Sequence, residues 1–427
     1  MESIIRETRS LCPVCLRNLP ARLLREADGR ILLEKRCPAH GEYRVPVWQG
    51  LVDWDAWLLG TPPLGADAAL NCPGSCGLCP EHEIGSCCVL LEVTPRCDLR
   101  CRFCFARGGE SAKEPGLDEL KDAVRDIVRQ CGSPLLQLSG GEPTLRDDLP
   151  ELVRFAKEAG CSYVQLNTNG LRLARERDYV KRLAEAGLDI VFLQFDGTRD
   201  GIYETLRGKP LLEEKTEAIL ACGAERIGVT LVPTVVPGVN DDDLGGIVAF
   251  ACAHAPAVRG VHFQPVSYFG RYPKRPEAAD RYTLDRLMAD VAEQARIPLS
   301  SFMPSRCDHP LCGFHASFLI EPDGSLRPLS SITHSSRSRG CEKDNRAYVA
   351  RHWRRAPEEP RPERVFSDGT DFDTFLYRLR HESLTLSAMA FQDALNLNLE
   401  RLRRCSLHVY DGGKIKPFCA KYLTPIE

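Results

Sequence analysis

The stretch "VLLEVTPRCDLRCRFCFA", residues 89–106, joins a short apolar run to three closely spaced cysteines. The run VLLEVT (89–94) has the length and composition of a buried strand. Cys97, Cys101 and Cys104 follow it with the spacing C-x3-C-x2-C. Structural zinc sites and complete iron–sulfur clusters normally take four protein ligands, so three thiolates leave one coordination position open. The stretch predicts a strand with a metal-binding loop at its C-terminal end.

Further apolar runs follow at intervals, with amphipathic helical stretches between them. Strands separated by helices form parallel βαβ units. We therefore predict an α/β fold, a partial (β/α)6 TIM-like barrel over residues 89–270, whose chemistry lies on the loops after the strands. The expected strands after the first are LLQLSG (135–140), YVQLNTN (163–169), IVFLQFD (190–196), IGVTLVPTV (227–235) and GVHFQPV (260–266).

Charge and cysteine content narrow the class of protein. The 427 residues carry a net charge of -3, so no global basic field favours nucleic acid. We find no apolar run long enough to span a bilayer and no apolar core of a signal peptide in "MESIIRETRSLCPVC", and we expect a cytoplasmic protein. Twenty cysteines in a reducing compartment indicate metal ligands rather than disulfides.

Residues 1–60 have the sequence pattern of a small domain that is stabilised by a bound metal ion. Cys12-x2-Cys15 and Cys37-x2-His40 are two metal knuckles separated by a hairpin with an Asp-Gly turn. This spacing is typical of a zinc ribbon or a rubredoxin-like site, and it predicts one iron or zinc ion. A solvated His40 and unpaired thiols are the alternative.

Two further cysteine groups predict auxiliary iron–sulfur clusters. In residues 61–88, Cys72, Cys76 and Cys79 repeat the C-x3-C-x2-C spacing, and Cys87 supplies a fourth thiolate, with Cys88 as the alternative ligand. In residues 271–427, two pairs of cysteines can close another cluster, although structural thiols or one zinc ion also fit. These pairs are Cys307 with Cys312 and Cys405 with Cys419.

The rest of the C-terminal region has fewer signals. We expect a helix over about 371–402. The charged, Pro-rich segment 351–364 is predicted to be a solvent-exposed connection and leaves open a contact with anionic headgroups at a membrane surface.

Polar residues lie at the C-terminal ends of three of the predicted strands, where a parallel fold brings side chains together. Two glycines allow a ligand to approach the backbone closely, and a carboxylate suits a cationic amine. Amide groups can bind a ribose or a carboxylate. We assign as cofactor-binding residues Phe103, Ser139, Gly140, Gly141, Glu142, Asn167, Asn169, Gln194 and Asp196.

These motifs, in this order, resemble the radical SAM superfamily, whose signature C-x3-C-x-aromatic-C is matched with Phe103 at the aromatic position. The resemblance implies a [4Fe–4S] cluster on Cys97, Cys101 and Cys104 as the catalytic centre. It also implies that S-adenosylmethionine (SAM) binds the open iron, with its ammonium group held by a motif like Ser139–Pro143. Reductive cleavage of SAM then yields a 5′-deoxyadenosyl radical.

The full order of motifs also resembles the archaeal tetraether lipid synthase family, long described as pterin-related methyltransferases. The motifs that carry this resemblance are "LCPVC…KRCPAHG", "CPGSCGLCPEH", "CDHPLCG" and "RCSLHVYDGGKIKPFC". It implies two auxiliary [4Fe–4S] clusters and one rubredoxin-like mononuclear iron. The C-terminal motif reads RCSL, where relatives often have two adjacent cysteines, and the chain is short for a lipid synthase. The resemblance therefore supports the cofactors more strongly than the substrate.

We accordingly expect an enzyme that functionalises an unactivated C–H bond, with C–C bond formation on a lipid-like substrate as the first hypothesis. Methyl transfer to a pterin or another small molecule is the alternative, and an iron–sulfur electron carrier without SAM chemistry is the alternative of another class. The expected partners are a small-molecule or lipid substrate and a reductant such as ferredoxin or flavodoxin. We expect the protein itself to be a monomer.

Overall fold

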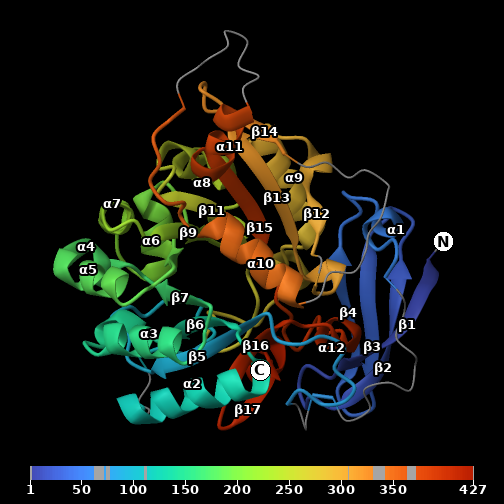
Figure 1. The fold of residues 1–427 in the computed structure, drawn as a ribbon. Helices are drawn as coiled ribbons and strands as arrows, with labels where there is room; N and C mark the ends of the chain where they lie inside the picture. Colours follow the sequence, from blue (N-terminus) through green and yellow to red (C-terminus); the bar gives the residue numbers. More distant parts are fainter. Residues whose placement is uncertain are drawn as a thin grey trace.

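The computed structural model describes residues 2–61, 72–73, 77–109, 113–305, 307–329, 342–362 and 372–426. Its strands form two sheets, a small one from the N-terminal residues and a large one that contains the barrel (Figure 1). Within the described residues, no helix is both long enough and apolar enough to cross a membrane.

The N-terminal sheet is an antiparallel meander in the order β1-β2-β3-β4. The expected Asp-Gly turn joins its second and third strands, and Gly29 has a φ of +88°, in the left-handed region that favours glycine. Helix α1 (Trp54–Trp57) packs its tryptophans against Trp48. The strands are β1 (Ser3–Leu11), β2 (Asn18–Arg25), β3 (Ile31–Cys37) and β4 (Gly41–Trp48).

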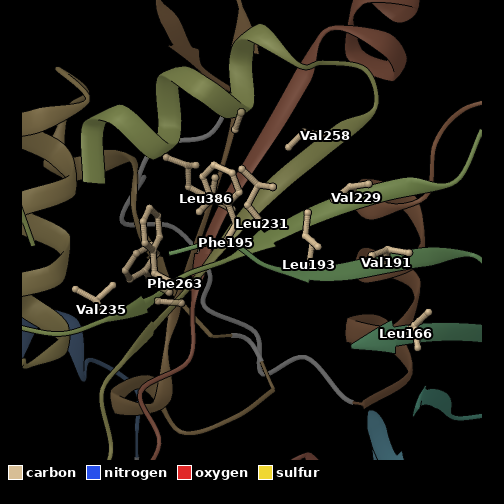
Figure 2. Packing of buried hydrophobic residues seen from close by; sticks show 14 of the residues in the cluster. Leu166, Val191, Leu193, Phe195, Val229, Leu231, Val235, Val258, Phe263 and Leu386 are labelled. Atoms are coloured by element: carbon tan, nitrogen blue, oxygen red, sulfur yellow. The ribbon is translucent and has the colours of Figure 1, made fainter. Parts of the chain in front are cut away.

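Six parallel strands form the barrel, and they confirm the predicted (β/α)6 arrangement. Val191, Leu193 and Leu231 point toward the outer helices and join the main core, as Figure 2 shows. Alternate residues point into the barrel interior instead. The six strands are β5 (Cys88–Thr94), β6 (Leu135–Gly140), β7 (Tyr163–Thr168), β8 (Ile190–Gln194), β9 (Gly228–Val232) and β11 (Val258–Pro265).

Amphipathic helices cover the outer face of these strands. Helix α2 (Leu117–Cys131) buries Leu120, Ala123, Val124 and Ile127, a spacing that places all four on one helical face. The other helices of this region are α3 (Leu149–Glu158), α4 (Leu171–Arg175), α5 (Arg177–Glu185), α6 (Asp200–Arg207), α7 (Leu212–Ala224), α8 (Leu244–Ala253) and α9 (Leu284–Gln294). Short 3₁₀ turns are η1 (Pro143–Leu145), η2 (Ala278–Asp280), η3 (Leu299–Ser301) and η4 (Pro310–Cys312).

C-terminal segments extend the barrel sheet on both sides. Strand β16 (Leu407–Asp411) is parallel to β5, and β15 (Ser383–Ala388) is parallel to β11, so that eight neighbouring strands run in the same direction. Among the described residues the sheet stays open, because β17 and β12 are its edges. The remaining strands are β10 (Thr234–Val235), β12 (Met303–Pro304), β13 (Phe314–Ile320), β14 (Leu326–Pro328) and β17 (Lys414–Pro417).

The expectation of one helix over about 371–402 is wrong. Helix α11 (Phe372–His381) is followed directly by β15, and only α12 (Leu399–Arg403) restores helix near the end of that range. Pairing with β11 and β13 draws the apolar run SLTLSA into the sheet, and tertiary pairing of this kind overrides local propensity. The last helix is α13 (Phe418–Lys421).

Helix α10 (Glu342–Trp353) covers the N-terminal ends of the barrel strands (Figure 1). Its Val349 packs with Leu135, Tyr163 and Ile190, the first residues of β6, β7 and β8. Arginines in and after the helix anchor it to residues just before β5, β6 and β8 and to the end of α7. Arg346 donates to the carbonyls of Ser133 and Ser86, Arg354 to the Asp189 carboxylate, and Arg355 to the carbonyl of Gly223. The segment predicted as a solvent-exposed connection thus contributes Arg354 and Arg355 to the closure of the barrel floor.

Buried polar contacts join the N-terminal sheet to the C-terminal segment. Lys35, 2% exposed, donates to Ser10 Oγ and to the carbonyls of Ala394 and Leu395. A second buried contact ties this segment to the barrel, where Arg281 donates to both carboxylate oxygens of Asp393 at 2.6 and 2.9 Å.

We predict that Arg281→Ala lowers the free energy of unfolding by about 3–5 kcal/mol, because it leaves the buried Asp393 carboxylate without its cation. Urea unfolding followed by circular dichroism measures the change. The exposed Arg275 is the matched control, and Arg275→Ala should stay within about 0.5 kcal/mol of the parent. Equal stability of the two variants would contradict the prediction.

Candidate active site and metal centres

A cavity of about 290 Å³ occupies the barrel interior. The three cysteines of the loop after β5 and the Ser139–Glu142 segment line one part of it. Side chains from the strand interiors, together with Trp353 of α10, line the rest. The polar motifs after successive strands are therefore brought together, as expected for a parallel fold.

The three-cysteine loop is held in place by Arg271. The backbones of Cys104 and Arg271 exchange two hydrogen bonds of 3.0 and 2.9 Å, and Arg271 Nε donates to the carbonyl of Cys101 at 2.9 Å. Gly270, with a φ of +69°, lies so close that a Cβ there would be 2.3 Å from the Cys104 carbonyl oxygen. Cys97, Cys101 and Cys104 all line the cavity and share one apolar cluster.

Gly140, the last residue of β6, and Gly141 hold this loop in place from the other side. Gly141 N donates to the carbonyl of Thr94, and Glu142 N donates to the carbonyl of Arg96, both at 2.7 Å. A Cβ on Gly140 would lie 2.4 Å from the Thr94 oxygen, and one on Gly141 would lie 2.1 Å from the Arg96 oxygen. No side chain fits at either position without moving the loop.

The Glu142 carboxylate is buried and accepts four hydrogen bonds from the chain itself. The donors are Thr144 N at 3.0 Å, Thr144 Oγ1 at 2.6 Å, Thr168 Oγ1 at 2.7 Å and Asn169 N at 2.7 Å. Burial raises the pKa of Glu142, and the donated hydrogen bonds oppose that rise. Glu142 lines the cavity and also ties the end of β6 to the end of β7.

Two asparagines lie at the C-terminal end of β7, Asn167 within the strand and Asn169 just after it. Asn169 Nδ2 donates to Asp98 Oδ1 of the three-cysteine loop at 2.6 Å. Asn167 Nδ2 is 3.4 Å from Ser139 Oγ, and both residues line the cavity, as does Phe103. The structure thus brings these predicted cofactor-binding residues to one wall.

The two residues predicted at the end of β8, Gln194 and Asp196, lie in different surroundings. Gln194 lines the cavity, with its side-chain amide 3.9 Å from Cys101 Sγ. Asp196 does not line it, because its carboxylate pairs with Arg207 at 2.6 and 2.7 Å. Arg207 is the group on the cavity wall, and Lys215 donates to the Asn169 carbonyl nearby. Two buried cations thus lie near the cysteine loop, where thiolate charge would accumulate.

The N-terminal metal site is assembled as predicted. His40 Nδ1 lies 3.5 Å from Cys12 Sγ and 3.4 Å from Cys37 Sγ, and Cys15 Sγ is 4.0 Å from Cys37 Sγ. The four ligand atoms all lie within 4.8 Å of one another. Three sulfurs and one imidazole nitrogen at this spacing fit one tetrahedral zinc or iron ion.

The predicted ligands of the first auxiliary cluster fall in different surroundings. Cys72 packs beside the apolar cluster that contains Cys419. Cys87 lies in a separate apolar cluster at the barrel floor, where Asn345 Nδ2 donates to its sulfur at 3.3 Å. Cys88 also lines the cavity, and Cys79 is half-buried. Cys76 lies outside the described residues.

Three of the four C-terminal cysteines come together. Cys312, Cys405 and Cys419 line a small cavity of about 20 Å³ together with Arg401. Cys307 is buried but is not part of that lining.

Several cavity residues were missed by the sequence analysis. The signal for most of them was available, because a strand's alternate residues face one side. Gln137 precedes Ser139 by two residues, Gln165 precedes Asn167 by two, and Phe192 precedes Gln194 by two. The same alternation on β11 places His262 and Gln264 in the cavity. Trp353 gave no such signal, since nothing in its helix indicates where that helix docks.

Comparison with known proteins places this geometry in context. Residues 91–251 match the family described as the radical SAM superfamily, and residues 4–49 match the HMPTM N-terminal zinc ribbon domain. The chain is 32% identical over 97% of its length, and 92% of the relative's, to the 7,8-dihydro-6-hydroxymethylpterin dimethyltransferase of Methanocaldococcus jannaschii. It is 27% identical to the GTP 3′,8-cyclase of Limosilactobacillus fermentum over 61% of the chain and 75% of that protein. Among solved structures, Streptococcus suis SuiB bound to S-adenosylmethionine is similar at 16% identity and a TM-score of 0.41, covering 51% of this chain and 49% of that one.

We predict that Gly141→Ala prevents iron binding at Cys97, Cys101 and Cys104, because the added methyl group must displace the loop. Iron content and visible absorbance after anaerobic reconstitution measure the effect. Gly116→Ala is the control, since nothing lies within 4 Å of a Cβ at that position. If both variants bind as much iron as the parent, the close approach does not position the cysteines.

We further predict that Cys37→Ala removes one metal ion, zinc or iron, from the N-terminal module by deleting one of four tetrahedral ligands. Elemental mass spectrometry measures this, with Cys222→Ala, a buried thiol of α7, as the control that keeps the ion. An unchanged metal content in Cys37→Ala would show that the knuckles do not bind metal.

Proposed function

The chain belongs to the radical SAM superfamily, in the family of the M. jannaschii pterin dimethyltransferase, and on that premise we propose that it transfers a methyl group to a small heteroaromatic substrate of the pterin class. It is a radical SAM enzyme. The substrate class and the methyl transfer are the proposal.

The donor set fits the cofactors of the superfamily. Three thiolates on one loop suit a [4Fe–4S] cluster with one open iron, and Ser139, Asn167 and Asn169 offer groups to bind SAM. When bound, this pair supplies one-electron cleavage of the sulfonium to methionine and a 5′-deoxyadenosyl radical. Because that cleavage leaves the methyl group on methionine, the proposal takes the transferred methyl group from a second SAM, which becomes S-adenosylhomocysteine, with both electrons supplied by the external reductant.

Residues of the chain position the cysteine loop and compensate the negative charge of its thiolates. Arg207 and Lys215 supply positive charge near Cys101, and Asp196 holds the Arg207 side chain in place through its paired contact. Glu142 and Asn169 fix the ends of β6 and β7 against the cysteine loop. Gln194 and Phe103 complete the wall on which SAM would lie.

One observation carries the choice of substrate. Five side-chain amides from the barrel strands line the cavity, Gln137, Gln165, Asn167, Gln194 and Gln264. Each amide has both donors and an acceptor, and the edge of a pterin ring alternates the same two kinds of group. A saturated chain beside these amides would leave buried polar groups unpaired, at a cost of about 1–3 kcal/mol each.

Coupling of lipid tails remains the second candidate, and a different wall favours it. Leu90, Phe269, Phe391, Leu407 and Phe418 make one side of the cavity apolar. A hydrocarbon chain could lie along that side, and a contact with a membrane surface would then deliver the substrate.

We also propose that the remaining cysteines hold two auxiliary [4Fe–4S] clusters that exchange electrons with the substrate site. The support is their number and the meeting of Cys312, Cys405 and Cys419 at one cavity. The predicted ligands are Cys72, Cys76, Cys79 and Cys87 for one cluster and Cys307, Cys312, Cys405 and Cys419 for the other. A ferredoxin or flavodoxin in the cytoplasm would supply electrons to the monomer.

Anaerobic turnover tests the proposal. The reconstituted protein, reduced in the presence of SAM and 7,8-dihydro-6-hydroxymethylpterin, should form 5′-deoxyadenosine and a pterin heavier by one or two methyl groups. Replacing Cys97, Cys101 and Cys104 together with Ala should abolish both products and remove about four irons per chain. Cys252→Ala, on α8 away from the cavity, should behave as the parent. Liquid chromatography with mass spectrometry measures both products.

The other outcomes identify the alternatives. If an iron-replete protein forms no 5′-deoxyadenosine, the methyl-transfer proposal fails and the electron-carrier alternative is supported. If the radical product appears and only a glycerol lipid with alkyl chains is converted, the enzyme acts on lipids and the pterin proposal fails.

A further inference from the structure

Three aromatic side chains from separate elements meet in the cavity. Phe192 of β8, His262 of β11 and Trp353 of α10 all line it. Their ring centroids lie 5.7 Å (Phe192–His262), 5.0 Å (Phe192–Trp353) and 5.9 Å (His262–Trp353) apart, with interplanar angles of 39°, 54° and 66°. No two of the rings are stacked on each other, so faces and edges remain for a further ring.

This aromatic trio adjoins the SAM wall without being part of it. Gln194, which approaches Cys101, and Phe192 are successive inward-facing residues of β8. Two residues of a strand span about 7 Å, so the Phe192 backbone lies that much nearer the barrel floor. A ring between the three aromatics would therefore lie beneath the cysteine loop, within the same cavity.

Polar atoms of the trio are available to a ligand. Trp353 Nε1 is buried and has no hydrogen-bond partner among the residues that the structure describes. His262 Nδ1 lies 2.9 Å from Ser387 Oγ, which leaves Nε2 for a ligand. Burial lowers the pKa of His262 to about 4, so the imidazole is neutral at physiological pH.

Trp353 is also held rigidly. Arg346 and Arg355, before and after it in the chain, donate to the backbone carbonyls of Ser86 and Ser133, just before β5 and β6, and of Gly223 in α7. A recognition group fixed before the ligand arrives loses little freedom on binding, and this favours affinity.

We infer that Phe192, His262 and Trp353 bind the conjugated ring of the substrate, so that a helix at the barrel floor selects the substrate. The inference rests on the proposed function for the identity of the ring. Trp353 Nε1 donates to a ring nitrogen or oxygen, His262 Nε2 contacts the ring edge, and Phe192 packs against its face.

Equilibrium binding of 7,8-dihydro-6-hydroxymethylpterin to the cluster-loaded protein, without reductant, tests the inference. Trp353→Phe keeps an aromatic ring and removes the N–H, so it should weaken binding by roughly five- to tenfold, the equivalent of one hydrogen bond. Trp353→Leu, which also removes the ring, should weaken it further. Tyr348→Phe, on the same helix but outside the cavity lining, should bind as the parent does.

Each result is informative. Equal pterin affinity in the parent and Trp353→Phe, with melting curves that show both folded, overturns the inference and leaves the proposed function standing. If the parent does not bind the pterin, the proposed substrate class fails, and a purine nucleoside and a flavin are used as probes instead. Binding of either probe that depends on Trp353 retains the ring site, whereas binding of neither overturns it.

Discussion

The close approach of the β6 turn to the loop after β5 is the contact on which the rest of the site depends. Gly141 and Glu142 donate their backbone hydrogens to the Thr94 and Arg96 carbonyls, and neither Gly140 nor Gly141 has space for a side chain. Because the cysteine loop is pressed against β6, the Glu142 carboxylate reaches the end of β7 and Asn169 reaches Asp98. Three strand ends are thereby fixed relative to one another. Few hydrogen bonds are needed to fix these strand ends, because the parallel sheet already places the loops that they join close together.

Much of this arrangement could be predicted from local sequence. Apolar runs bounded by turn residues gave the barrel strands, since a strand buried on its outer face must be apolar at every second position. The knuckle spacing likewise predicted the cluster of Cys12, Cys15, Cys37 and His40. Asp196 shows the limit of such reasoning. A carboxylate after a strand can face a ligand or an arginine, and only the fold places Arg207 beside it.

What could not be predicted depends on contacts between distant parts of the chain. The run SLTLSA became a strand because β11 and β13 present partners to it, although its surroundings suggested helix. Helix α10 closes the barrel floor through arginines that contact residues just before β5, β6 and β8 and the end of α7. The run SLTLSA alternates polar and apolar residues, yet its pairing with β11 and β13 and the docking of α10 cannot be recognised locally, because the partners are far away in sequence. The inward-facing glutamines are different, since their two-residue alternation was present and needed only to be followed along each strand.

The pairing of β16 with β5 sets an order of events for a newly made chain. Strand β5 carries the cysteine loop, yet one of its two edges is covered only by residues near the end of the sequence. Domains fold as synthesis proceeds, and a pairing this distant in sequence forms late. That flank of the barrel is therefore still uncovered while the ribosome is making the last strands.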